Sequence, residues 1–251
     1  MYDAIGAEWI KLRSLRSTPA LLVIGLTVTV LTGLLFGLLI GPEFQRATPA
    51  DRMDFDPVGL SFTGMQLGQL AVVVLAVLAV GSEFGSGMIR TSLAAVPRRG
   101  TLLTAKFVLL GSIGMAWGLV TGAASLLVGT WALGADLAAL PPGDLIRTVS
   151  GAGAYAALLA VSAGSVTFMV RRSIAALGIL LPLLFLVSSL LAASSRLRPL
   201  ARLLPDRAGL RLMQVHQESG DLTPLAGGAV LLLWTASAAI VAHLAFVRRD
   251  V

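Results

Sequence analysis

Six long apolar runs separated by short polar segments set the pattern of hydrophobic and polar positions along the chain. A helix of about 20 apolar residues crosses the roughly 30 Å hydrocarbon core of a membrane. Each run is long enough to do so, and the pattern therefore predicts an all-α integral membrane protein with one transmembrane domain over residues 1–251. The predicted spans are residues 19–41, 58–82, 106–134, 148–170, 173–195 and 223–247.

A polar and basic segment of eighteen residues, EFGSGMIRTSLAAVPRRG, separates the second and third spans at positions 83–100. Gly85 and Gly87 let the chain turn out of the membrane, and Pro97 ends the helical stretch that follows. Apolar side chains recur at helical spacing on one flank of this stretch, at Met88, Ile89, Leu93 and Val96. Arg90 and Thr91 lie off that flank. The segment therefore predicts a short, half-apolar, basic helix that suits the docking of a soluble partner.

This segment also carries a resemblance to a known family. A Glu that closes the second span, a Gly-x-Gly-Met-Ile-Arg-Thr-x-Leu run and a Pro-Arg-Arg resemble the first cytoplasmic loop of ABC-2 type exporter permeases. In that family the loop carries a coupling helix that sits on a separate ATPase subunit. The alternative is an ordinary short basic loop with no docking role. The resemblance implies ATPase-coupling roles for Glu83, Met88, Ile89, Arg90, Thr91, Leu93, Arg98 and Arg99.

Two further segments fit the same family. Residues 1–18 place Ile5, Trp9 and Leu12 on one helical side, which predicts an interfacial helix although Glu8 intrudes on the apolar arc. This helix resembles the N-terminal elbow of the family. Residues 196–222 mix arginines with leucines and resemble the short external helices that similar exporters carry between their fifth and sixth spans. The arginines are Arg196, Arg198, Arg202, Arg207 and Arg211.

Small residues recur every four positions in the first and third spans. Such spacing lays a groove along one side of a membrane helix, so that a neighbouring helix can approach closely. The groove predicts either packing within the bundle or a seam between two protomers. The glycines assigned to helix packing are Gly33, Gly37, Gly114, Gly118 and Gly122.

Polar and aromatic side chains within two spans are candidates for a substrate pathway. Phe62, Gln66 and Gln69 lie in the first half of the second span, and a buried amide there needs a partner or water. Phe185 and Ser189 follow Pro182, which bends the fifth span. Alternatively, the glutamines form hydrogen bonds between helices, and the serine hydroxyl bonds to the backbone of its own helix.

Composition and charge place the chain in the membrane and indicate its orientation. Hydrophobic residues make up 56% of the chain and charged residues 13%, against about 25% charged in soluble domains. Lys and Arg number 11 on the side of the termini and 8 on the other, and five of those 8 fall within residues 196–221. Both termini are therefore expected in the cytoplasm, across a bacterial cytoplasmic membrane. The net charge of +6 forms no basic face interleaved with aromatics, so no nucleic-acid partner is expected.

The chain lacks residues for chemistry of its own. It has no phosphate-binding G-x-x-x-x-G-K-[ST] loop and no cysteine, and its 13 acidic residues lie in loops or at span edges, which predicts no buried carboxylate. No cofactor or metal is expected on this chain, with ATP and Mg bound by the partner. The predicted function is outward transport of a small molecule, lipid or peptide by alternating access.

The expected partners are an ABC ATPase subunit, a second permease copy or paralogue, and membrane lipid. One alternative is a non-transporting scaffold or immunity protein with a permease-like body. A remote one is an intramembrane serine protease that pairs Ser162 or Ser165 with His243.

Overall fold

The computed structural model describes residues 2–14, 17–48, 56–96, 98–136, 141–194, 196–215 and 220–248, and within these ranges it contains helices and no β-strand. Six helical segments are long and apolar enough to span a membrane. This confirms the prediction of an all-α, six-span membrane protein. The segments are α2 (Ser17–Arg46), α4 (Met65–Gly85), α6 (Arg99–Leu133), α7 (Pro142–Val170), the run from α8 to α9 (Ser173–Ala193), and α12 (Pro224–Arg248).

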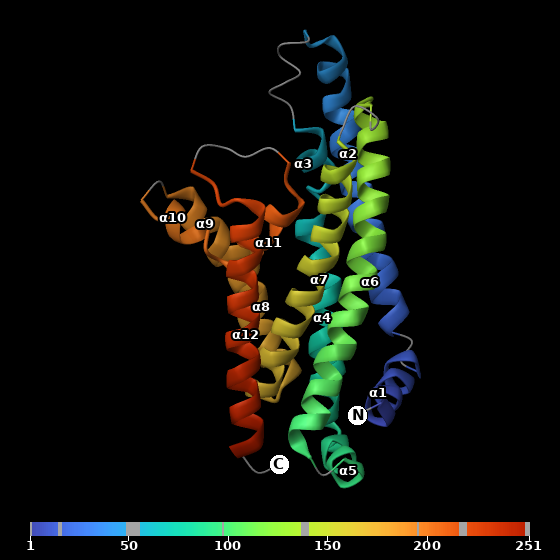
Figure 1. The fold of residues 1–251 in the computed structure, drawn as a ribbon, viewed down its shortest axis with the longest axis vertical. Helices are drawn as coiled ribbons and strands as arrows, with labels where there is room; N and C mark the ends of the chain where they lie inside the picture. Colours follow the sequence, from blue (N-terminus) through green and yellow to red (C-terminus); the bar gives the residue numbers. More distant parts are fainter. Residues whose placement is uncertain are drawn as a thin grey trace.

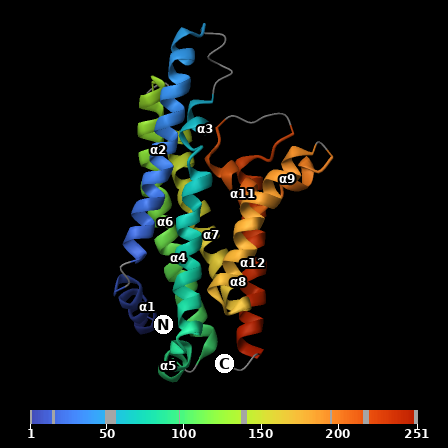
Figure 2. The same cartoon turned by 180° about the vertical axis from the view of Figure 1, so that it is seen from behind.

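Shorter helices flank the bundle at both ends. Helix α1 (Tyr2–Ser14) lies beside the lower ends of α2 and α6, and α5 (Met88–Ala95) lies at the same end as both chain termini (Figure 1). The view from behind shows the same arrangement (Figure 2). Toward the opposite end lie α3 (Pro57–Ser61), α10 (Arg198–Ala201), α11 (Pro205–Leu210) and the 3₁₀ turn η4 (Arg211–Met213).

Two of the predicted spans are irregular. The second is interrupted at residues 62–64, so that α3 and α4 are separate helices, and the Asp56 carboxylate caps α3 by accepting from the Gly59 N–H at 2.9 Å. The fifth span contains a π-helical stretch, η3 (Pro182–Val187), between α8 (Ser173–Leu181) and α9 (Ser188–Ala193). Because proline lacks an N–H for the helix ladder, the wider turns begin at Pro182.

The glycine grooves hold helices of the same chain together. A Cβ built on Gly37 of α2 would lie 2.7 Å from the Cβ of Ala132 on α6. On the next face of α6, a Cβ on Gly118 would lie 2.4 Å from the carbonyl oxygen of Ala152 on α7. The structure thus places these glycines at contacts within the bundle and leaves no room there for a second protomer.

We expect Gly118→Ala to lower the thermal stability of the purified protein. The added methyl would force α6 and α7 apart, and overpacking of this kind costs about 1–3 kcal/mol. Gly178→Ala is the matched control, because nothing lies within 4 Å of its new methyl and alanine favours helix. Tryptophan fluorescence during heating in detergent measures both. Equal changes in melting temperature would contradict the packing role of Gly118.

The basic segment after the fifth span folds back onto the bundle. Helix α11 packs closely against α12, where a Cβ on Gly227 would lie 2.3 Å from the carbonyl oxygen of Ala208. Arg202 and Arg211 both form ion pairs with Asp221, the former at 3.4 Å. Internal partners therefore neutralise part of this segment's charge, which explains how arginines collect away from the basic end of the bundle.

The structure corrects the expectation of no buried carboxylate, because Glu8, Glu83 and Asp206 are buried within the described part of the chain. Glu8 and Glu83 lie at the end of the bundle that carries α5, and Asp206 is fully buried in α11. Burial raises the pKa of the Asp206 carboxyl, and the neighbouring charge of Arg207 only partly offsets this effect. The burial of these carboxylates could not be predicted from their positions at the edges of apolar runs, because segments distant in the sequence cover them.

We expect Asp206→Asn to stabilise the protein at pH 7. A carboxyl whose pKa is raised in the folded state destabilises that state once the pH exceeds its unfolded pKa of about 3.9, so the gain should shrink as the pH approaches 4. Asp221→Asn is the contrasting variant, because it removes the ion-pair partner of Arg202 and Arg211 and should destabilise. Melting temperatures between pH 4 and 8 test both. A loss of stability in Asp206→Asn at pH 7 would contradict this reading.

Candidate functional site

The predicted docking element is a distinct helix between α4 and α6. Gly87 adopts the left-handed conformation (φ 73°) that reverses the chain after α4, and α5 begins at the next residue. The helix ends at Ala95, and Val96 (φ −127°, ψ 86°) no longer has helical backbone angles. Pro97, predicted to end it, lies outside the described residues. The next helix begins at Arg99, within the stretch assigned to the loop.

The two flanks of α5 have different surroundings. Ile89 is only 2% exposed and belongs to the hydrophobic core, and Leu93 and Val96 pack against that core. Met88 is 44% exposed, and Arg90 and Thr91 are exposed as well. Ile89 and Leu93, two of the residues predicted to couple to an ATPase, therefore anchor the helix to its own body. The face open to a partner is formed by Met88, Arg90 and Thr91.

A buried network of charges joins α5 to three other helices. The Lys106 ammonium on α6 pairs with Glu83 at the end of α4 at 2.7 Å and also with Glu8 on α1. Lys11 on α1 bridges the same two carboxylates, at 2.8 Å to Glu8 and 3.0 Å to Glu83. Lys11 also donates to the Ser92 hydroxyl of α5 at 2.9 Å. Two carboxylates and two ammonium groups thus connect α1, α4, α5 and α6.

The network gives each buried carboxylate two ammonium partners. Isolated ions in a low-dielectric interior are costly, whereas paired and hydrogen-bonded ions are tolerated. Burial lowers the pKa of Lys11, but its hydrogen bonds to Glu8 and Glu83 outweigh that effect and raise the pKa above the ordinary value. Lys11 therefore stays charged at physiological pH. Of the four charged residues in this network, the sequence resemblance assigned only Glu83 to coupling.

The two arginines after the loop lie in different surroundings. Arg98 is exposed just before α6. Arg99 donates to the carbonyl oxygens of Phe246 and Val247 at 3.2 and 3.3 Å, at the end of α12. A cation at a helix C-terminus meets the unpaired carbonyls and the negative end of the dipole. Arg99 therefore ties the last span to the first turn of α6.

The comparison with protein families agrees with this arrangement. A family model described as "ABC-2 family transporter protein" matches residues 4–188, which is more than half of the chain. The chain belongs to the ABC-2 transporter family. The match begins within α1 and ends at the first residue of α9, so it includes the whole charge network and α5. No curated protein matches the chain.

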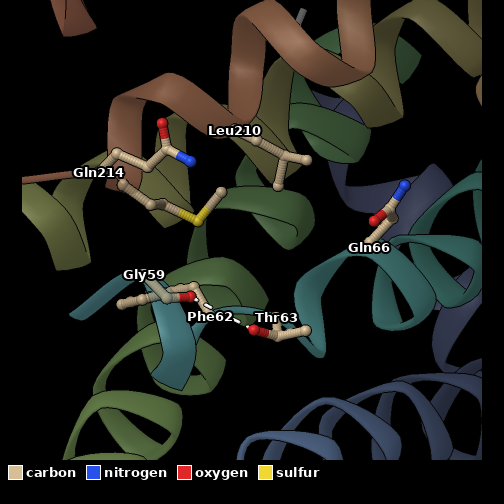
Figure 3. Close-up of a pocket in the computed structure, with 7 residues that line it drawn as sticks. Gly59, Phe62, Thr63, Gln66, Leu210 and Gln214 are labelled. Atoms are coloured by element: carbon tan, nitrogen blue, oxygen red, sulfur yellow. Dashed lines mark hydrogen bonds between the residues drawn. The ribbon is translucent and has the colours of Figure 1, made fainter. Parts of the chain in front are cut away.

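The candidate pathway residues of this ABC-2 permease are not gathered in one place. Phe62 and Gln66 line a pocket of about 220 Å³ where the second span is broken, across from Leu210 and Gln214 (Figure 3). Met213 also lines this pocket. Gln69 does not line this pocket; it is buried and accepts a hydrogen bond from the Tyr155 hydroxyl. Its own amide N–H donates to the Gln66 carbonyl at 2.8 Å.

The remaining candidates lie away from this pocket. Phe185 packs against the core and Ser189 is exposed on α9, and neither lines the pocket. Gln69 therefore fits the interhelical hydrogen bond that was its competing interpretation. Tyr155 supplies this bond from the fourth span, and no sequence pattern marked it.

The geometry does not support a protease. The Ser162 hydroxyl lies 2.9 Å from that of Thr235, and the Ser165 hydroxyl donates to its own helix at the Val161 carbonyl. His243 lies about 12 Å farther along α12 than Thr235, at 1.5 Å per residue, and faces Gly100. The structure thus does not bring either serine to the histidine.

Proposed function

We propose that this ABC-2 permease is the membrane subunit of an ATP-driven exporter and that a separate ATPase subunit docks on α5. The observation that supports this is the division of α5 into two faces. Ile89 fixes the helix in the core, while Met88, Arg90 and Thr91 form a small exposed face with a cationic centre. A helix held on one side and open on the other can transmit a push from a docked partner to the spans.

The charge network defines which elements move together in this proposal. Glu83 and Lys106 connect the inner ends of α4 and α6, and Lys11 adds α1 through Glu8 and α5 through Ser92. A displacement of α5 therefore acts on three other helices, α1, α4 and α6. Alternating access then follows from tilting α4 and α6 relative to α7 and α12. ATP and Mg belong to the partner, and a second permease copy or paralogue completes the pathway.

The orientation rests on charge. The end of the bundle that carries both termini also carries α1, α5 and the exposed Arg90, Arg98 and Arg172. Lys and Arg flank spans on the cytoplasmic side. We place this end in the cytoplasm of a bacterium, where an ATPase has access to ATP.

Co-purification with an ATPase tests the proposal. The tagged full chain, expressed in its native host and extracted in mild detergent, is expected to carry an ATPase subunit whose turnover changes when the permease is added back. An isolated chain that binds no ATPase would contradict the proposal. The permease-like scaffold would instead retain a partner whose turnover does not change.

A further inference from the structure

An apolar groove of about 800 Å³ lies where α1 meets the first turns of α2 and the middle of α6. Its walls include Trp9 and Leu12 from α1, Leu22 and Val23 from α2, and Ile113 and Val120 from α6. Trp117 fixes one wall, because its indole N–H donates to the Leu22 carbonyl at 2.9 Å. The groove is therefore part of the packed structure of two spans and their neighbouring interfacial helix.

The groove matches one leaflet of a bilayer in length. It runs from Thr18 to Leu26 along α2 and from Leu109 to Val120 along α6, which at 1.5 Å per residue is about 12 and 16 Å. Half of a roughly 30 Å hydrocarbon core is about 15 Å. A single acyl chain that enters beside α1 would therefore reach the bilayer midplane where the groove ends.

Charge is confined to the end of the groove beside α1. Arg13 lines that end and, among the residues that the structure describes, is the only charged side chain in the lining, which contains no carboxylate in that part of the chain. Arg13 forms no ion pair within the described part of the chain. Trp9, 48% exposed, lies at the same end, and tryptophan prefers the level of the lipid headgroups. The lining is thus apolar at membrane depth and cationic at headgroup depth.

We propose that this groove is a binding site for one anionic phospholipid of the leaflet that contains α1. The acyl chain lies between α2 and α6 against Val23 and Ile113, and the phosphate meets the Arg13 guanidinium. A lipid seated there contacts α1 and the two spans at once, and so supports the position of the helix that carries Glu8 and Lys11. The proposal is independent of any ATPase partner.

Native mass spectrometry of the purified full chain tests the site with two probes, dioleoyl phosphatidylglycerol and dioleoyl phosphatidylcholine. We expect one retained lipid per chain and an occupancy about five-fold higher for phosphatidylglycerol, which is the effect of one arginine near an anionic lipid surface. Val23→Trp places an indole in the groove against the wall that the acyl chain contacts and should sharply lower retention of both lipids. Val241→Trp, on the exposed face of α12, is the matched control and should retain them.

The headgroup contact is tested separately. Arg13→Gln should keep one lipid but lose the preference for phosphatidylglycerol, whereas Arg172→Gln, at the same end of the bundle, should keep that preference. Equal retention in Val23→Trp and Val241→Trp would overturn the site, and an unchanged preference in Arg13→Gln would overturn the headgroup contact. A dimer that Val23→Trp dissociates, with no lipid lost, would assign the groove to a second copy.

Discussion

Replacing Lys106 by methionine is expected to destabilise the permease by about 3–5 kcal/mol, the cost of removing one partner from a buried ion pair. Lys106 is 4% exposed and pairs with both Glu8 and Glu83, which are equally buried. Without its ammonium, two carboxylates would share the positive charge of Lys11 alone. Thermal unfolding followed by tryptophan fluorescence, together with size-exclusion profiles in detergent, measures the loss.

The chain offers a matched control for this variant. Lys11 bridges the same two carboxylates, but its side chain is 31% exposed, and solvent weakens its contribution to about 1 kcal/mol or less. Lys11→Met should therefore be much milder than Lys106→Met. Adding Glu8→Gln and Glu83→Gln to Lys106→Met should restore most of the stability, because no buried carboxylate is then left with too few partners and the Lys11 side chain, 31% exposed, can be solvated. Two results would contradict the stabilising role of the ion pairs of Lys106. One is an equal loss of stability in Lys11→Met and Lys106→Met, and the other is no recovery of stability in the triple variant.

The helical architecture could be predicted from the sequence because it depends on local composition. Six apolar runs with basic ends are sufficient to predict six spans, and Gly87 followed by Met88 marks the start of α5. Small residues at four-residue spacing also predicted close helix contacts, because such a groove depends only on the sequence of one helix. Which helix fills it, such as Ala152 of α7 against Gly118, depends on the three-dimensional packing.

The candidate site was predicted less well, because burial is decided by distant segments. Glu8 looked like a flaw in an amphipathic helix, yet it is a partner of Lys106, 98 residues away. Ile89 and Met88 are adjacent apolar residues on α5, but the core covers one and leaves the other open. Lysine within the first turns of an apolar run, as at position 106, was the signal that could have indicated a buried partner.

The face of α5 that remains exposed is where a partner should be most sensitive to change. Arg90→Glu is expected to reduce co-purification of the ATPase subunit by more than ten-fold, because interface arginines are often hot spots worth about 2 kcal/mol or more and the variant reverses the charge. Its fold should be unaffected, since the side chain is exposed and has no ion-pair partner within the described residues. The matched control is Arg172→Glu, an exposed arginine in the loop between α7 and α8.

Thermal stability and partner retention, measured on the same preparations, separate docking from folding. Arg90→Glu should melt like the parent protein while losing the ATPase, and Arg172→Glu should keep both properties. Ile89→Asp should instead lower the melting temperature even without a partner, because it places a carboxylate in the core. If Arg90→Glu retains the ATPase and its turnover at parental levels, then α5 is held in place by Ile89 but receives nothing from an ATPase, and the exposed row of Met88, Arg90 and Thr91 is an ordinary polar surface.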